Sequence, residues 1–128
     1  MSEDRNSETR KNQVMHLHME RLRKAREERP VIVREGIEAL VRLMAVTEGD
    51  SGQCRKVAAF LLGLYNGTRF PFDLTDLRAL DLDLFEDCMA VLRMDKQPER
   101  EIHLYFTHGG ERFEQLATAF GIEDRSRS

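Results

Sequence analysis

At 128 residues the chain has the length of a single domain, and a composition of 41% hydrophobic and 34% charged residues excludes a wholly disordered protein. Its longest apolar run, VAAFLLGLY, is far shorter than the roughly 20 residues that cross a bilayer, which excludes a transmembrane helix. The net charge is −3, and residues 31–122 carry fifteen acidic and ten basic side chains. This acidic excess argues against nucleic acid or anionic lipid as the main partner. The polar N-terminus lacks the core of a signal peptide, so we expect a cytoplasmic protein.

The N-terminal arm comprises residues 1–29 and carries eight basic against six acidic side chains. Residues 1–13 have almost no apolar side chain and are predicted to be disordered. Over residues 14–29, Met15, Met19 and Leu22 recur at helical spacing, which predicts an amphipathic arm helix. Pro30 restricts the residue before it and predicts the end of that helix.

Two core helices are predicted next. The segment VIVREGIEALVRLMAV places five apolar residues on one side: Val33, Ile37, Leu40, Val41 and Met44. Asp50 and Gln53 have the spacing of a capping box for the helix CRKVAAFLLGLYNG, whose apolar residues surround nearly the whole helix and make it the predicted centre of the fold. Asn66 and Gly67 predict its end.

Two further helices are predicted in the segment that follows. Asp73 is placed to cap the short helix LTDLRAL, and Asp81 to cap the longer helix LDLFEDCMAVLRM. In the longer helix, Phe85, Met89 and Leu92 form the predicted inward stripe.

The C-terminal part completes an all-α fold. EIHLYF is predicted as a helix rather than a strand, because Pro98 and two glutamates precede it. ERFEQLATAFG is a helix that ends at Gly121, and residues 123–128 are a disordered tail. We therefore predict one domain over residues 31–122, a compact bundle of about six helices with a mobile charged N-terminal arm.

No motif in the chain indicates catalysis or a bound metal. His16 and His18 lie about 200° apart around a helix and cannot chelate one ion. Cys54 and Cys88 are expected to be buried thiols, and no nucleotide-binding or hydrolase motif occurs. We predict no enzyme activity, no cofactor and no metal site.

The acidic run of residues 73–87 holds six carboxylates and only one basic residue, Arg78. Carboxylates at helix starts bind free backbone N–H groups, which explains much of this run without a function. Asp83 and Asp87, at i and i+4, have the spacing to share a proton or a cation, but a solvated face is the favoured interpretation.

The loop RFPFDL precedes this run, and its two phenylalanines either lock the helices together, which is favoured, or anchor a partner. The predicted partner-binding residues are Phe70, Phe72, Asp76, Asp83, Glu86 and Asp87.

The N-terminal arm supports an alternative. Its basic residues predict a contact with nucleic acid, although we expect a protein partner first. These residues are Arg21, Arg23, Lys24, Arg26 and Arg29. The apolar stripe of residues 14–29 also has the form of a homo-oligomer interface.

The segments VAAFLLGLYNGTRFPFDLTDLRALDLDLFEDCMAVLRMD and EIHLYFTHGGERFEQLA resemble small uncharacterised helical proteins carried on integrative and conjugative elements of proteobacteria. The resemblance covers residues 31–122 and implies an accessory protein of mobile DNA, without implying an activity. The sequence therefore predicts a non-enzymatic protein-protein interaction module, a stoichiometric inhibitor or accessory protein that acts through its acidic helical face. The alternative is a nucleic-acid-associated regulator that uses the arginine-rich N-terminal helix.

Overall fold

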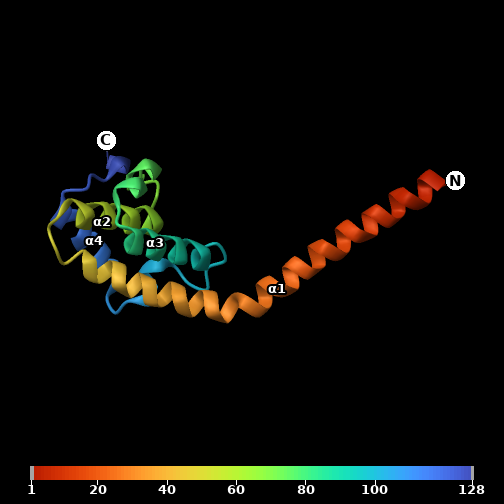
Figure 1. The fold of residues 1–128 in the computed structure, drawn as a ribbon. Coiled ribbons are helices and arrows are strands. Elements are labelled where there is room, and N and C mark those ends of the chain that lie inside the picture. Colours follow the sequence, from red (N-terminus) through yellow and green to blue (C-terminus); the bar gives the residue numbers. More distant parts are fainter. Residues whose placement is uncertain (1, 128) are drawn as a thin grey trace. The chain divides into compact units, whose positions relative to one another are not determined.

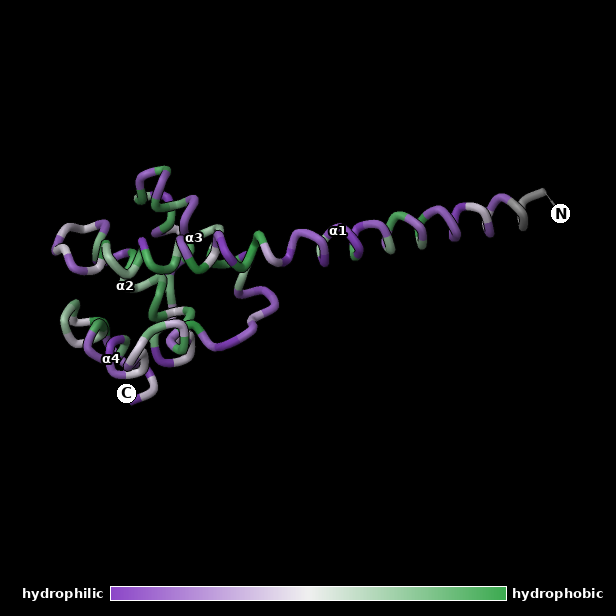
Figure 2. Tube along the Cα trace, turned by 90° about the horizontal axis from the view of Figure 1, so that it is seen from below, coloured by the Kyte–Doolittle hydropathy of each residue, from purple (hydrophilic) through white to green (hydrophobic). Residues whose placement is uncertain are grey.

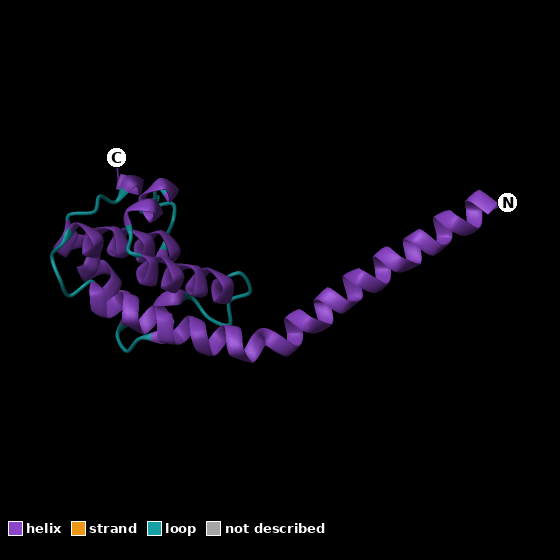
Figure 3. Cartoon of the chain, in the orientation of Figure 1, coloured by secondary structure: helices purple, strands orange, loops and turns teal. Residues whose placement is uncertain are grey.

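The computed structural model describes residues 2–127, and all regular structure in that range is helical (Figure 3). Four α-helices are present: α1 (Ser2–Val46), α2 (Gly52–Tyr65), α3 (Leu82–Asp95) and α4 (Gly109–Phe120). Three short 3-10 helices accompany them: η1 (Leu74–Ala79), η2 (Ile102–Tyr105) and η3 (Arg125–Arg127). The predicted all-α class is confirmed.

The chain divides into two compact units, Met1–Val33 and Arg34–Ser128. We call the described part of the first the N-terminal unit and that of the second the body. Helix α1 runs through both units (Figure 1). The predicted helix end at Pro30 is therefore wrong: strong helix formers precede the proline, and the part of α1 that follows it is held by its buried side chains, which outweigh the lost hydrogen bond and the clash of the ring.

Residues 2–13, predicted to be disordered, also belong to α1. Figure 2 shows a mostly hydrophilic trace along this part of α1, whereas apolar residues gather in the body.

Within the body, α1 contributes a buried stripe of Ala39, Leu40, Leu43 and Met44. Val41, predicted to face inward, is 55% exposed. Gly36 marks a close approach of α1 to α3, because a Cβ built on it would lie 2.5 Å from the Cβ of Met94. A glycine at this position lets the two helices pack closely.

Helix α2 is the centre of the body, as predicted, and it packs on α4, η1 and η2. Six of its side chains are buried: Cys54, Val57, Ala58, Phe60, Leu61 and Leu62. The predicted capping box is wrong, because Ser51 is the N-cap and its hydroxyl accepts a hydrogen bond from the backbone N–H of Cys54 at 3.3 Å. The predicted C-terminal end at Asn66 is confirmed.

Helix α3 buries a different stripe from the predicted one. Cys88, Val91 and Met94 are buried, whereas Leu92, predicted to face inward, is exposed. Apolar residues occur in adjacent pairs along this helix, so two stripes one position apart fit the same sequence, and only the neighbours of α3 decide which one is buried.

In the C-terminal part of the body, the segment before Gly109 is less helical than predicted. The helix predicted after Gly109 is present. EIHLYF forms only the single turn η2. Gly109 begins α4 where a Cβ would lie 1.6 Å from the carbonyl oxygen of His103, so only glycine fits. Phe113, Leu116 and Ala117 are buried, and Gly121 ends the helix with a φ of 61°, as predicted. Within the described residues, no helix has the length and apolar character to cross a membrane.

Candidate functional site

The six carboxylates of the acidic run differ in how they are used in the body. Asp73 caps η1: its Oδ1 accepts hydrogen bonds from the Thr75 hydroxyl at 2.7 Å and the Thr75 backbone N–H at 2.9 Å. These hydrogen bonds lower the pKa of Asp73. The predicted cap is confirmed at this position.

Asp81 occupies the N-cap position of α3 but makes no side-chain cap bond. Instead, the side-chain amide of Gln53 donates to Asp81 Oδ2 at 3.0 Å, and the backbone N–H of Asp81 donates to Gln53 Oε1 at 2.7 Å. The two residues thus join the start of α3 to the start of α2. The sequence predicts that Gln53 forms a capping box with Asp50, but its side chain forms these hydrogen bonds with Asp81 instead.

Two of the predicted partner-binding carboxylates are held by cations of the body. Asp76 pairs with Lys56 at 3.2 Å. Asp87 accepts hydrogen bonds from Arg42, the shortest from Nη2 at 2.8 Å and from Nε at 3.1 Å, and this contact raises the pKa of Arg42. Asp87 therefore joins α3 to α1. Because Arg42 already neutralises it, Asp87 is not available to share a proton or a cation with Asp83.

The last two carboxylates, Asp83 and Glu86, are exposed on the first turns of α3, and within residues 6–127 neither has a salt bridge or a side-chain hydrogen bond. Leu82 precedes them and is 71% exposed. Glu86 lies four residues after Leu82 and three after Asp83, and side chains at these spacings are neighbours on a helix surface. We call Leu82, Asp83 and Glu86 the acidic face.

The loop before η1 is fixed by its phenylalanines. Phe70 is only 2% exposed, so this predicted partner-binding residue belongs to the core. Phe72 is half-buried and packs edge-on against Phe60, with ring centroids 5.7 Å apart. The interpretation that these aromatic side chains lock the loop onto α2, favoured from the sequence, agrees with this packing.

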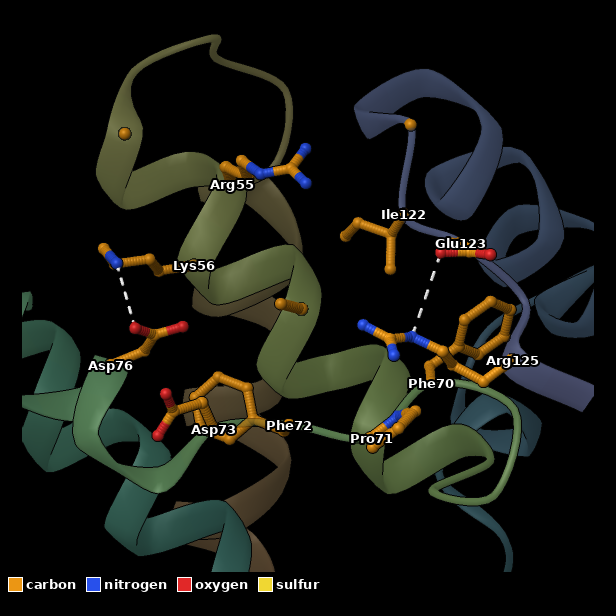
Figure 4. A pocket seen from close by; sticks show the side chains of 13 residues that line it. Arg55, Lys56, Phe70, Pro71, Phe72, Asp73, Asp76, Ile122, Glu123 and Arg125 are labelled. Carbon is orange, nitrogen blue, oxygen red and sulfur yellow. Dashed lines mark hydrogen bonds and ion pairs between the residues drawn. The ribbon is translucent and has the colours of Figure 1, made fainter. Parts of the chain in front are cut away.

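A groove of about 520 Å³ lies between α2, this loop and the segment after α4 (Figure 4). Its charged groups are mostly paired: Lys56 contacts Asp76 on one side, and Arg125 approaches Glu123 at 3.9 Å on the other. Arg55 donates to the carbonyl oxygen of Phe120. Because its charges already compensate one another, the groove has little net field to attract a charged ligand.

A charged cluster that the sequence does not predict joins α2, the loop, α4 and the segment after α4. Arg69 forms two hydrogen bonds of 2.7 Å with Glu114 and one of 2.8 Å with Asp124, while the Tyr65 hydroxyl donates to Glu114. Hydrogen bonds from Arg69 and Tyr65 lower the pKa of Glu114 to about 2. Hydrogen bonds from Ser126 and Arg69 lower that of Asp124 to about 2. Arg69 lies 45 positions from Glu114 and 55 positions from Asp124, so no local spacing in the sequence indicates the cluster.

The thiols are placed as predicted, because both Cys54 and Cys88 are free and buried. Burial raises the pKa of Cys88 to about 12, which keeps it protonated at neutral pH and weakly nucleophilic. His16 and His18 are exposed on the N-terminal unit. In the part of the chain that the structure describes, no group of three or more metal-ligating side chains comes together.

The basic residues predicted for nucleic acid lie on α1 in the N-terminal unit. Arg23 pairs with Glu20, and Lys24 approaches Glu28 at 3.9 Å. Arg21 and Arg26 are exposed.

Comparison with known proteins finds a family match within the body. A model described as a family of unknown function (DUF7673) matches residues 37–121. No curated protein and no solved structure matches the chain.

Proposed function

The chain belongs to the family of unknown function DUF7673, and we propose that it is a non-enzymatic protein-protein interaction module. The observation that carries the proposal is the uneven use of the acidic run. Asp73, Asp76, Asp81 and Asp87 are bound within the body, whereas Asp83 and Glu86 are left exposed beside Leu82.

An exposed leucine beside two unneutralised carboxylates fits a partner that presents an apolar pocket and basic side chains. The carboxylates steer the approach of such a partner and fix its orientation, while burial of Leu82 supplies affinity. Of the predicted partner-binding residues, this proposal keeps Asp83 and Glu86 as the main contacts and adds Leu82. Phe72, at the edge of the groove, is a peripheral contact in this proposal.

In the role we propose, the protein is a cytoplasmic accessory protein of mobile DNA that binds its partner stoichiometrically. One form of this role is an inhibitor that covers a nucleic-acid-binding surface by presenting carboxylates where phosphates would lie. The burial of Cys88 and its raised pKa support the non-enzymatic part of the proposal.

The test is affinity capture from a proteobacterial extract with three forms of the full chain: the wild type, Asp83→Arg with Glu86→Arg, and a control with Glu48→Arg and Glu99→Arg. The control changes the charge equally at two exposed acidic residues outside the acidic face. We expect a basic protein that the wild type and the control retain, that the acidic-face variant loses, and that moderate salt releases. Retention of the same protein by the acidic-face variant would contradict the proposal.

A second candidate is the nucleic-acid-associated regulator. The exposure of Arg21 and Arg26, which have no ion pair within the described residues, favours it. Gel retardation of duplex DNA at low salt tests it, with the intact chain and a form that lacks residues 1–29. Loss of binding only in the shortened form would support this candidate, and no retardation by the intact chain would exclude it.

A further inference from the structure

The N-terminal unit presents an apolar stripe on α1 that no described residue covers. Met15, Met19 and Leu22 follow one another at i, i+4 and i+7 and are 62%, 54% and 41% exposed. Side chains at this spacing lie on one side of a helix. Burying such a stripe removes apolar surface from water, so a complementary surface would stabilise it.

Charged residues are arranged unevenly around this stripe. Arg26 and Arg29 follow Leu22 at i+4 and i+7, so the same side of α1 continues as a basic surface. Glu20 lies five residues after Met15, and Glu27 five after Leu22, which turns each of them about 140° away from the stripe. Beyond Leu22, the side that carries the apolar stripe is therefore basic, whereas Glu8 lies on the same side seven residues before Met15.

This arrangement disfavours parallel pairing of the stripe with itself. In a parallel coiled coil, the heptad positions that Met15, Met19 and Leu22 define would next place Arg26 and Arg29 in the seam. Two copies would then bring like charges together where apolar contacts are needed, which is destabilising. The end of the stripe at Leu22, which continues into Arg26 and Arg29, calls for a surface that is apolar and acidic.

The acidic face of the body has this chemistry, with exposed Leu82 beside the unneutralised Asp83 and Glu86. The residues outside the N-terminal unit carry an excess of acid, and residues 1–29 an excess of base. We propose that the basic apolar side of the N-terminal unit of one copy binds the acidic face of a second copy, and that two copies exchange this contact reciprocally in a two-fold dimer.

This inference rests on the proposed function, because it uses the same acidic face, and it adds a means of regulation. In the dimer, the second copy occupies the surface that a partner needs, so partner binding and self-association compete. Higher protein concentration or lower salt favours the dimer, and a basic partner dissociates it.

The experiment measures the mass of the full chain by sedimentation velocity over a concentration series, at about 50 mM and about 500 mM salt. We expect a dimer at low salt that dissociates at high salt. Arg26→Glu with Arg29→Glu, or Asp83→Arg with Glu86→Arg, should each weaken dimerisation at least about tenfold. Glu48→Arg with Glu99→Arg is the control and should dimerise like the wild type.

Mixing the two charge-reversed variants gives the sharpest result. Each variant alone opposes like charges at both contacts, whereas a mixed dimer restores opposite charges at both, so the mixture should dimerise where the separate variants do not. The milder pair Asp83→Asn with Glu86→Gln should weaken dimerisation in the same direction and guards against a folding defect of the arginine variant.

Several outcomes would overturn the inference. One is a monomeric wild type at every concentration, and another is equal dimerisation of both charge-reversed variants. A monomer in which the N-terminal unit loses protection from hydrogen exchange on Asp83→Arg with Glu86→Arg would indicate a contact within one chain. A monomer that binds duplex DNA through Arg26 and Arg29 would assign the stripe's basic side to nucleic acid. None of these touches the proposed function, which fails only if the acidic-face variant keeps its protein partner.

Discussion

Helix α1 passes through both units of the chain, and its two parts show that helical pattern and burial are separate properties. In the N-terminal unit, Met15, Met19 and Leu22 have the spacing of a core stripe and are solvent-exposed. In the body, Leu40 and Leu43 have the same character and are completely buried. An amphipathic sequence therefore predicts a helix with an apolar side, while the neighbours in space decide whether that side contributes to stability.

The largest difference in stability between the two units is expected when a leucine of α1 is replaced by alanine, once in the body and once in the N-terminal unit. Leu40→Ala removes a fully buried side chain and should lower the free energy of unfolding by about 3 kcal/mol. Leu22→Ala removes an exposed one and should change it by less than about 0.5 kcal/mol. Urea denaturation of the two variants at a concentration where the chain is monomeric checks this difference. Equal destabilisation would mean that Leu22 is covered within one chain.

A slightly smaller effect is expected where the backbone of the body is most crowded. Gly109→Ala would place a Cβ 1.6 Å from the His103 carbonyl oxygen, and the strain should cost about 2–3 kcal/mol. Gly110→Ala is the matched control, because the nearest atom would be 4.0 Å away, and it should stabilise α4 by about 0.5–1 kcal/mol. Thermal unfolding distinguishes the two. A tolerated Gly109→Ala would show that the turn between η2 and α4 can shift.

A pH-dependent effect is expected from the charged cluster around Arg69, which has no counterpart in the N-terminal unit. The pKa of Glu114 falls from its usual 4.5 to about 2 in the folded protein, so the unfolded chain binds more protons between these values. The stabilisation is complete above about pH 4.5 and is lost as the pH falls through about 2. Asp124 contributes in the same direction from 3.8 to about 2.

Glu114→Gln should therefore destabilise the body at neutral pH and flatten the dependence of its urea midpoint on pH between about 5 and 3. Gln115→Ala, at an exposed position of the same helix that carries no charge, is the control and should leave the slope as in the wild type. An unchanged slope in Glu114→Gln would show that the cluster contributes little to acid sensitivity.

The smallest effect on the body is expected from Pro30→Ala. The substitution restores a backbone hydrogen bond within α1 and removes the clash of the proline ring with the preceding turn. Helix content by circular dichroism and protection of the amides near residue 30 from hydrogen exchange should increase, while the melting temperature of the body stays the same. A shift in that melting temperature would show that the two units unfold together.

Most of the local structure of the body could be predicted from the sequence. The apolar circumference of residues 57–65 identified α2 as the centre, and Asp73 and Gly121 were placed correctly as caps because capping depends on a few neighbouring residues. Part of the candidate site was also predictable. Asp83 and Glu86 stood out as carboxylates in a run with one basic residue, and both are exposed.

The remaining features were decided by contacts between segments that are distant in the sequence. Arg42 lies 45 positions from Asp87 and Lys56 lies 20 positions from Asp76, and each pairs with that carboxylate. Two of the predicted contact residues are therefore neutralised for reasons that local spacing does not show. The choice between Leu92 and Val91 as the buried residue of α3 was made by its packing.

The sequence by itself determined the all-α class, the central helix and the division between a polar N-terminal segment and an apolar body, because periodicity, capping and composition act over a few residues. Only the tertiary structure decided which carboxylates remain available and which apolar stripes are buried. Ion pairing and burial depend on distances in space, which chain folding sets between residues that the sequence keeps far apart.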